Sequence, residues 1–367
     1  MGQDIVVAAV PPVPAVLAEA AEAAGRFIAA ARAPASLRAY ASDWRQFLRW
    51  GRDISAITLP ATPATVAAFL AWMASWSPPA RVATIQRRCA SIGYYHRAAG
   101  VDDPCADRLV AMTLSGIART LGAAPVKKTA LTAGLLSKVL KKIPDDPSDL
   151  TAVRDRALLL VGFAAALRRS ELVALDLGDV ERHAQGVVIT VRRGKTDQTG
   201  LGHRLAVPHG RRLKPVAALD AWLAALREAE SQQAAKKQKN QIDGKIGAKN
   251  QIDGKIGAPA GLASGVESGT NLNPALFRGI HGPTILAGRL CTDQVAAIVK
   301  SRCAAAGLDP KLYSAHSLRS GYCTSAAEAG AALASIAGHA RHAKLDTTRG
   351  YMQVADAFRD HSGRGFL

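Results

Sequence analysis

Apolar residues recur at helical spacing along the first third of the chain. Between residues 36 and 120, segments carry an apolar residue every three or four positions, the repeat of one helix face. Thr62-Pro63 predicts a helix start, because a capping hydroxyl precedes a first-turn proline, and Pro78-Pro79 ends that helix. The apolar positions of the first three helices are Leu37, Tyr40, Trp44, Phe47 and Leu48; Val66, Phe69, Leu70 and Met73; and Ile85, Cys89, Ile92 and Tyr95. With a fourth helix from about 106 to 120, the pattern predicts an all-α domain over residues 33–122.

The pattern changes in the rest of the chain, where helical and strand-like segments alternate. Val187 to Val191 is rich in β-branched residues and Arg204 to Pro208 is a second short run, so the polar stretch between them predicts a hairpin tip. Helical spacing marks residues 133–142, 153–166, 215–229 and 292 to about 332. We therefore expect a mixed second domain over residues 130–367, with helices around a small β-sheet, in a chain that is mainly α.

Three segments fit neither domain. Residues 1–32 are Ala-rich and interrupted by prolines, which predicts a flexible arm, and residues 123–129 contain Pro125 and two lysines, typical of an interdomain linker. The nonapeptide Asn-Gln-Ile-Asp-Gly-Lys-Ile-Gly-Ala begins at Asn240 and again at Asn250. Two copies are too few for a solenoid, so the composition predicts a disordered insertion over residues 231–272. We interpret the repeat as a tandem duplication without its own function; a basic loop that contacts DNA is the alternative.

Composition adds a strong positive charge. The 367 residues include 47 Lys and Arg against 29 Asp and Glu, a net charge of +18 that suits a polyanionic partner. The five cysteines form no CxxC pair, which predicts reduced thiols in the cytoplasm and no metal cluster. The sequence contains neither a signal peptide's basic n-region nor a run of 18 uncharged apolar residues, so we expect no membrane span. A GxxxxGK[ST] loop is also missing, and we expect no cofactor.

Six side chains have the chemistry for cleaving a phosphodiester without metal. They are Arg168, Lys195, His316, Arg319, His342 and Tyr351. A phenolate at Tyr351 could form a phosphotyrosine that stores the bond energy for religation. Because an ordinary phenol has a pKa of about 10, we expect surrounding cations to lower that of Tyr351. Arg168 and Arg319 supply planar, permanently charged groups that bind phosphate through two hydrogen bonds.

The order and spacing of these residues resemble the tyrosine recombinases, the phage-integrase family of site-specific DNA strand exchangers. Arg168 and Glu171 match a Leu-Arg-x-x-Glu-Leu pattern, and a His-x-x-Arg pattern follows at 316–319. His342 stands nine residues before Tyr351, at the family's His-or-Trp position. The resemblance covers residues 35–230 and 273–360. It implies a four-helix core-binding domain and a mixed catalytic domain that form a C-shaped clamp around DNA.

The resemblance also implies a role for each residue. Tyr351 would be the nucleophile, Lys195 the general acid for the 5′ oxygen, and Glu171 the acidic partner that supports the first arginine. The second histidine has two candidates. His339 stands in a Gly-His pair that resembles the family's signature, but only His342 has the nine-residue spacing, and we therefore predict His342.

The predicted function is site-specific recombination for integration, excision or resolution of DNA elements, through a 3′-phosphotyrosyl intermediate and a Holliday junction. The partners implied are double-stranded DNA at a specific recombination site and a homotetramer on two sites. The resemblance also allows accessory DNA-bending proteins. Predicted DNA contacts outside the site are Arg81, Arg87, Arg88, Lys127 and Lys128. For any one of these cations, a solvated surface is the simpler interpretation.

Two alternatives remain open at this point. A type IB topoisomerase uses nearly the same chemistry without strand exchange, but its resemblance would favour a lysine in place of His316 and it lacks the four-helix leading domain. A non-catalytic DNA-binding regulator on the same fold is the second alternative, although a protein that only binds needs no phenol at Tyr351.

Overall fold

The computed structural model describes residue 23 and residues 32–122, 128–192, 202–252 and 274–356. Contacts divide the chain into two compact units, Met1–Val126 and Lys127–Leu367. Each unit has its own hydrophobic core. Most of the predicted N-terminal arm and most of the predicted linker, including Lys127, lie outside the described residues.

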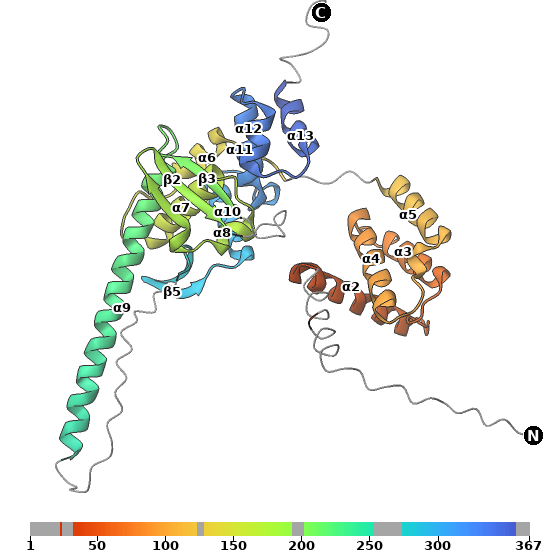
Figure 1. The fold of residues 1–367 in the computed structure, drawn as a ribbon, viewed down its shortest axis with the longest axis horizontal. Helices are drawn as coiled ribbons and strands as arrows, with labels where there is room; N and C mark the ends of the chain where they lie inside the picture. The colour runs from red at the N-terminus through yellow and green to blue at the C-terminus, as the bar shows by residue number, and fades with distance from the viewer. Residues whose placement is uncertain (1–22, 24–31, 123–127, 193–201, 253–273, 357–367) are drawn as a thin grey trace, which may run out of the picture. The chain divides into compact units, whose positions relative to one another are not determined.

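The first unit is an all-α domain (Figure 1). Its elements are α2 (Pro34–Asp53), α3 (Pro63–Ala74), α4 (Val82–Ala98), the 3-10 helix η1 (Pro104–Ala106) and α5 (Arg108–Leu121). α3 begins where the sequence predicts, because the Thr62 hydroxyl accepts a hydrogen bond from the backbone N–H of Thr65 at 3.1 Å. The predicted apolar stripes meet in the core, where Phe47 packs edge-to-face on Phe69. The four predicted helices are confirmed.

The second unit combines helices with two small sheets (Figure 1). Its helices are α6 (Ala133–Leu140), α7 (Leu150–Ala164), α8 (Arg169–Ala174), α9 (Pro215–Ile252), α10 (Thr292–Ala305), α11 (His316–Glu328), α12 (Leu333–Ala340) and α13 (Leu345–Asp356), with the 3-10 helices η2 (Leu177–Asp179) and η3 (Pro310–Leu312). Its strands are β1 (Val180–His183), β2 (Gly186–Val191), β3 (His203–Pro208), β4 (Arg278–His281) and β5 (Thr284–Arg289). The mainly α class with a small sheet is confirmed, and β4–β5 adds a second sheet.

The three-stranded sheet has the order β1-β2-β3, and both pairs are antiparallel. In β2, Val187, Ile189 and Val191 are buried, and Ile189 lies opposite Leu205 of β3. This alternation places one sheet face on the core of the second unit. The predicted hairpin is therefore confirmed, although its tip, residues 193–201, lies outside the described residues.

The backbone at Leu131 passes very close to the first half of α11, the helix that carries two of the predicted site residues. A Cβ atom on Gly321 would lie 1.9 Å from the carbonyl oxygen of Leu131, a distance that no side chain can occupy. The same segment is tied to α11 by the backbone N–H of Leu131, which donates to the carbonyl of Ser317 at 2.9 Å. Glycine at 321 therefore lets α11 pack directly against the backbone that enters this unit.

The repeat region differs from its predicted disorder. α9 continues through residue 252 as one helix and extends beyond the rest of its unit, so residues 231–252 are helical (Figure 1). The physical reason for the first part of this extension lies in residues 232–239, which are all Ala, Gln or Lys, good helix formers that prolong a helix already nucleated and packed in the core. The second repeat from residue 253 onward lies outside the described residues.

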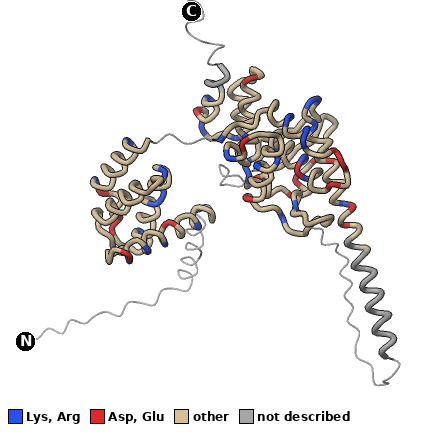
Figure 2. Tube along the Cα trace, turned by 180° about the vertical axis from the view of Figure 1, so that it is seen from behind, with Lys and Arg blue, Asp and Glu red and all other residues tan. Residues whose placement is uncertain are grey.

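Positive charge is spread over both units. Figure 2 shows Lys and Arg along the helices of the first unit and throughout the second, with fewer acidic residues between them. Among the described residues, no helix is both long and apolar enough to cross a membrane.

Candidate active site

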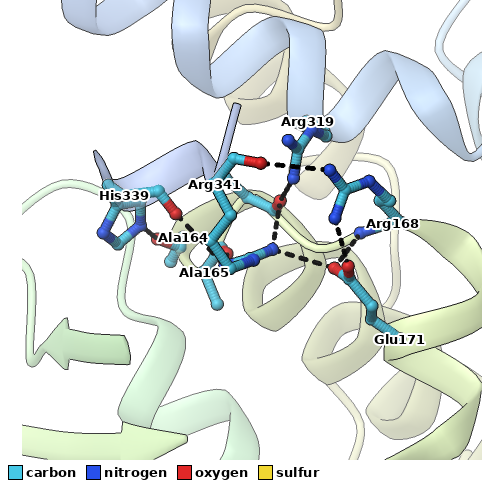
Figure 3. Close-up of polar contacts among 8 residues, drawn as sticks. Ala164, Ala165, Arg168, Glu171, Arg319, His339 and Arg341 are labelled. Atoms are coloured by element: carbon cyan, nitrogen blue, oxygen red, sulfur yellow. Dashed lines mark hydrogen bonds and ion pairs between the residues drawn. The ribbon is translucent and has the colours of Figure 1, made fainter. Parts of the chain in front are cut away.

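The C-terminal end of α7 gathers three side chains from distant parts of the chain (Figure 3). His339 Nε2 donates to the carbonyl of Ala164 at 2.8 Å. The carbonyl of Ala166 accepts from Arg319 Nη1 at 2.8 Å and from Arg341 Nη2 at 3.1 Å. The last carbonyls of a helix lack intrahelical partners and carry partial negative charge, so cationic donors stabilise them. Hydrogen bonds to the end of α7 therefore hold His339, Arg319 and Arg341 in position.

One carboxylate, Glu171, is shared by two arginines. It accepts from the backbone N–H of Arg168 at 2.8 Å and from Arg168 Nη1 at 2.6 Å, because Arg168 directly precedes α8 and Glu171 lies in its first turn. Arg341 Nη2 donates to the same carboxylate at 2.8 Å. Burial opposes ionisation of Glu171, but the charge of Arg341 and the hydrogen bonds from Arg168 outweigh it and hold its pKa below the usual value. Glu171 is thus an ionised support beneath both arginines.

The cations outnumber their carboxylate. Arg168 and Arg341 bond Glu171, and Arg319 lies close to them on the carbonyl of Ala166, which leaves an excess of positive charge in a largely buried site (Figure 3). The Arg319 side chain is almost completely buried, and burial together with the charges of Arg168 and Arg341 lowers its pKa to about 10. Clustered guanidinium groups with too few carboxylates are stabilised by an added anion, and phosphate is the anion that they bind in bidentate geometry.

Tyr351 on α13 lies beside His342. The two rings stack with centroids 6.0 Å apart and an interplanar angle of 10°. Burial, followed by the charges of Arg319 and Arg168, lowers the pKa of His342 to about 4. The same three causes lower the pKa of His316. Both imidazoles are therefore neutral near pH 7 in the DNA-free protein, and each offers one N–H donor.

The expected lowering of the tyrosine pKa is wrong for the DNA-free protein. Burial raises the pKa of Tyr351, and the neighbouring Cys323 adds to that effect, while Arg319 opposes it without outweighing it. Tyr351 packs against the small apolar cluster that contains Cys323, which explains why desolvation dominates. The phenol therefore rests in its protonated form.

Lys195 lies outside the described residues, but the base of its hairpin does not. Arg192, at the end of β2, pairs with Asp176 and with Asp179, the latter at 2.7 Å. Arg289, at the end of β5, also pairs with Asp176 and donates to the carbonyl of residue 173 at 2.7 Å. The pairs of Arg192 anchor the hairpin, and the contacts of Arg289 anchor β5, to the segment that follows α8. Both arginines line the same pocket as Glu171.

The structure places five of the six predicted residues close enough to one another for the charges of some to act on the pKa values of others. They are Arg168, His316, Arg319, His342 and Tyr351, and Glu171 is hydrogen-bonded to Arg168. His339 occupies a different place: its ring stacks on Tyr322 with centroids 4.6 Å apart and its Nε2 bonds the backbone.

Two residues of the site have no counterpart among the residues predicted from the sequence, Arg341 and Thr348. Arg341 adopts a left-handed conformation, φ 55°, at the end of α12. No local pattern predicts its contact with Glu171, because its partner lies far away along the chain. Thr348 hydrogen-bonds His342 at 2.8 Å, and its position one helical turn before Tyr351 is a signal that could have found it.

The predicted DNA contacts of the first unit differ in exposure and in the hydrogen bonds that they already make within the protein. Arg81 is exposed directly before α4. Arg87 makes two hydrogen bonds to the buried Asp43, at 2.7 and 3.0 Å, with its side chain half exposed. Arg88 is 12% exposed and bonds Asp43 and Gln46 while lying over an aromatic ring. Arg88 therefore holds the first unit together, and Arg81 is the more accessible candidate.

The remaining candidate, Lys128, is exposed in the second unit. Its Nζ donates to the carbonyl of Lys311 at 2.5 Å. An ammonium group has three donors, so this single bond leaves Lys128 able to contact a phosphate as well.

A buried cluster of arginines beside a tyrosine and two neutral imidazoles defines a phosphoryl-transfer enzyme with a phenol as its candidate nucleophile. The sequence comparisons agree with that class. The model of the phage integrase family matches residues 134–357. The chain is 30% identical over 347 residues to an integrase/recombinase xerD homolog of Selenomonas ruminantium, covering 92% of this chain and 87% of that protein. The chain therefore belongs to the phage integrase family and is a tyrosine-type site-specific recombinase.

Other relatives agree with this assignment. The tyrosine recombinase XerD of Xanthomonas axonopodis pv. citri is 30% identical over 212 residues, 58% of this chain and 53% of that protein. Two solved structures share the fold. The Tn1549 transposon integrase in complex with transposon right end DNA has a TM-score of 0.53 at 15% identity, covering 92% of this chain and 97% of that one. A lambda integrase dimer bound to a COC′ core site has a TM-score of 0.51 at 14% identity, covering 92% and 77%.

Proposed function

We propose that this recombinase binds double-stranded DNA at a specific site and that Tyr351 attacks the scissile phosphate there. The observation that carries the proposal is a cluster of three guanidinium groups with one carboxylate, in which Arg168 and Arg341 bond Glu171 and the charge of Arg319 acts on both Glu171 and Tyr351. That excess of positive charge suits a phosphodiester, whose negative charge grows on the non-bridging oxygens as the nucleophile adds. Arg168 and Arg319 hold those oxygens, and Glu171 keeps Arg168 in place.

The reaction exchanges one phosphodiester for another. The Oη atom of Tyr351 forms a bond to phosphorus as its proton passes to water, and the bond from phosphorus to the 5′ oxygen breaks. Lys195 gives a proton to that oxygen, which leaves a 3′-phosphotyrosyl enzyme and a free 5′-hydroxyl. The 5′-hydroxyl of a second duplex then attacks the phosphotyrosine and releases the tyrosine. Because bond energy is conserved at each step, no nucleotide hydrolysis is needed.

Strand exchange requires four active subunits on two sites, and a first round of exchange gives a Holliday junction that a second round resolves. This assembly, accessory DNA-bending proteins and a cytoplasmic location are parts of the proposal. So is the contribution of Arg81, Arg87 and Lys128 to phosphate binding away from the site. The proposal covers integration, excision and resolution of DNA elements alike, since all three use the same chemistry.

Covalent capture tests the proposal. The protein is incubated with sheared DNA that flanks its own gene, the reaction is quenched in SDS, and protein-linked ends are recovered and sequenced. We expect 3′-linked ends at one sequence, lost in Tyr351→Phe and retained in Tyr322→Phe, a matched control whose ring also lies near the site. Adducts that persist in Tyr351→Phe would refute the nucleophile assignment. Two differently marked duplexes then distinguish strand exchange from relaxation of a single duplex.

A further inference from the structure

His342, whose ring stacks on that of the proposed nucleophile, forms a partly buried hydrogen bond with Thr348. His342 follows the end of α12, and Thr348 lies in the first part of α13. The distance from His342 Nδ1 to Thr348 Oγ1 is 2.8 Å, and Thr348 is completely buried. Since Thr348 and Tyr351 stand three residues apart on one helix, the hydroxyl and the phenol occupy the same face and both meet the imidazole.

The direction of this hydrogen bond decides what the imidazole can do. A neutral imidazole has one N–H and one lone pair, so its two tautomers offer a donor at opposite nitrogens. If Thr348 accepts from Nδ1, then Nε2 has only a lone pair, which repels an anionic phosphate. If Thr348 donates to Nδ1, the ring proton is on Nε2, where it can donate to a phosphate oxygen.

The surroundings of His342 keep its ring neutral, so the tautomer matters. Burial and neighbouring positive charge lower the pKa of His342 to about 4, which prevents the ring from carrying protons on both nitrogens near pH 7. The titratable and charged groups that face it are Arg168 before α8, His316 and Arg319 on α11, Arg341 at the end of α12 and Tyr351 on α13.

The burial of Thr348 favours one direction. Within the described part of the chain, the hydroxyl of Thr348 has His342 Nδ1 as its one hydrogen-bond partner. If Thr348 accepted from Nδ1–H, its own hydrogen would be buried without an acceptor, which is costly. Donation to Nδ1 satisfies the hydroxyl and the ring nitrogen together.

We propose that Thr348 is a positioning residue that donates to His342 Nδ1 and thereby fixes the proton on Nε2, the tautomer that can donate to the scissile phosphate. The role assigned to His342 rests on the proposed function, but the tautomer itself does not. A chain with the other tautomer would have every cation in place and still present a lone pair to the anion. Thr348 thus selects the donor form without touching the DNA.

The direct test is nitrogen NMR of the DNA-free, full-length protein with ¹⁵N-labelled histidine, the His342 signals being assigned with His342→Gln. We expect a protonated Nε2 and an unprotonated Nδ1 in the native protein. Thr348→Ser, which keeps the hydroxyl, should preserve that pattern, and Thr348→Val, which has the same shape without it, should give a mixture of tautomers. A native protein with the proton on Nδ1 would overturn the proposal, whether or not the protein cleaves DNA.

Cleavage provides the second measurement, on a duplex identified by covalent capture. We expect Thr348→Val to reduce the single-turnover rate of adduct formation by about 10-fold or more, with DNA affinity within about twofold and Thr348→Ser close to native. If the native protein binds the DNA used for covalent capture but forms no adduct with it, the proposed function alone is refuted. A Thr348→Val protein with the native tautomer and rate would refute the role of Thr348 alone.

If Thr348→Val does not fold, Thr348→Ala provides the same loss of the hydroxyl with less bulk on the helix. In addition, His342→Trp places an indole at 342, whose N–H has no tautomer to choose. In folded protein, the tautomer proposal predicts that removing the hydroxyl slows cleavage more in the His342 background than in the Trp background. Equal losses in the two backgrounds would indicate a merely structural Thr348.

Discussion

Arg341 and Glu171 form a buried ion pair between residues 170 positions apart in the chain, with Arg341 Nη2 2.8 Å from Glu171 Oε2. Both side chains are almost fully buried. Through this pair the end of α12 is fastened to the start of α8, and the backbone carbonyl of Arg341 accepts in turn from Arg168 Nη2 at 3.1 Å. The arginine that we expect to hold the scissile phosphate therefore depends on a residue that does not need to touch DNA.

This dependence gives the first prediction. Arg341→Gln should lower the free energy of unfolding of the second unit by about 3 kcal/mol, because it leaves a buried carboxylate with one fewer partner. Hydrogen exchange of peptides from that unit measures the change. Arg349→Gln is the matched control: its pair with Asp346 is exposed, and its loss should cost less than about 0.5 kcal/mol. Equal effects of the two substitutions would contradict the role of Arg341.

The second prediction separates the two candidate histidines. His339→Gln should destabilise the second unit by about 1–3 kcal/mol, since it removes a partly buried hydrogen bond to the end of α7, while adduct formation stays within about threefold of native. His342→Gln should slow adduct formation by about 100-fold with little loss of stability. Unfolding and single-turnover cleavage are measured for both. The reverse pattern would assign the catalytic role to His339.

The third prediction concerns the first unit. Arg81 is exposed, so Arg81→Ala should weaken DNA binding and reduce the slope of log affinity against log salt by about 1. Arg88→Ala should leave that slope unchanged and instead destabilise the first unit by about 1–3 kcal/mol, because Arg88 bonds Asp43 and Gln46. Binding titrations at several salt concentrations and unfolding distinguish the two. A reduced salt slope in Arg88→Ala would show that its guanidinium is available to DNA.

Elements with a clear periodic pattern could be predicted from the sequence, and elements without one could not. Helices such as α2 and α4 have apolar stripes that repeat over several turns, so their spacing is unmistakable. β5 has only Ile285 fully buried, and α8 is six residues long, too short to show a period. Their structure is set by packing against other elements rather than by local pattern.

The residues of the candidate site also fall into two groups, those that belong to a sequence motif and those that do not. The site's chemical groups have motifs that are weak singly, and their joint order, which resembles that of the family, predicts Arg168, Arg319 and Tyr351. Arg341 has no motif, because its contact with Glu171 exists only once α12 and α8 have packed together. The resting pKa of Tyr351 could not be predicted either, since it depends on the balance between burial and Arg319.

The fourth prediction is a pH dependence of stability in the DNA-free protein. Three histidines, His316, His339 and His342, have pKa values lowered by burial, that of His342 from 6.5 to about 4. Between those two pH values the unfolded chain binds more protons than the folded protein, so the free energy of unfolding falls as the pH falls. This destabilisation is absent well above pH 6.5 and complete below about pH 4.

His342→Gln removes the contribution of His342 to this fall in the free energy of unfolding. Because the ring of His342 is partly exposed, we expect it to account for about 1–2 kcal/mol of the loss, less than its full pKa shift would give. Hydrogen exchange of the second unit at a series of pH values should therefore give a shallower decline in His342→Gln than in the native protein. Parallel declines would mean that His342 titrates normally in the folded protein, and that the cations around it are not close enough to act on its ring.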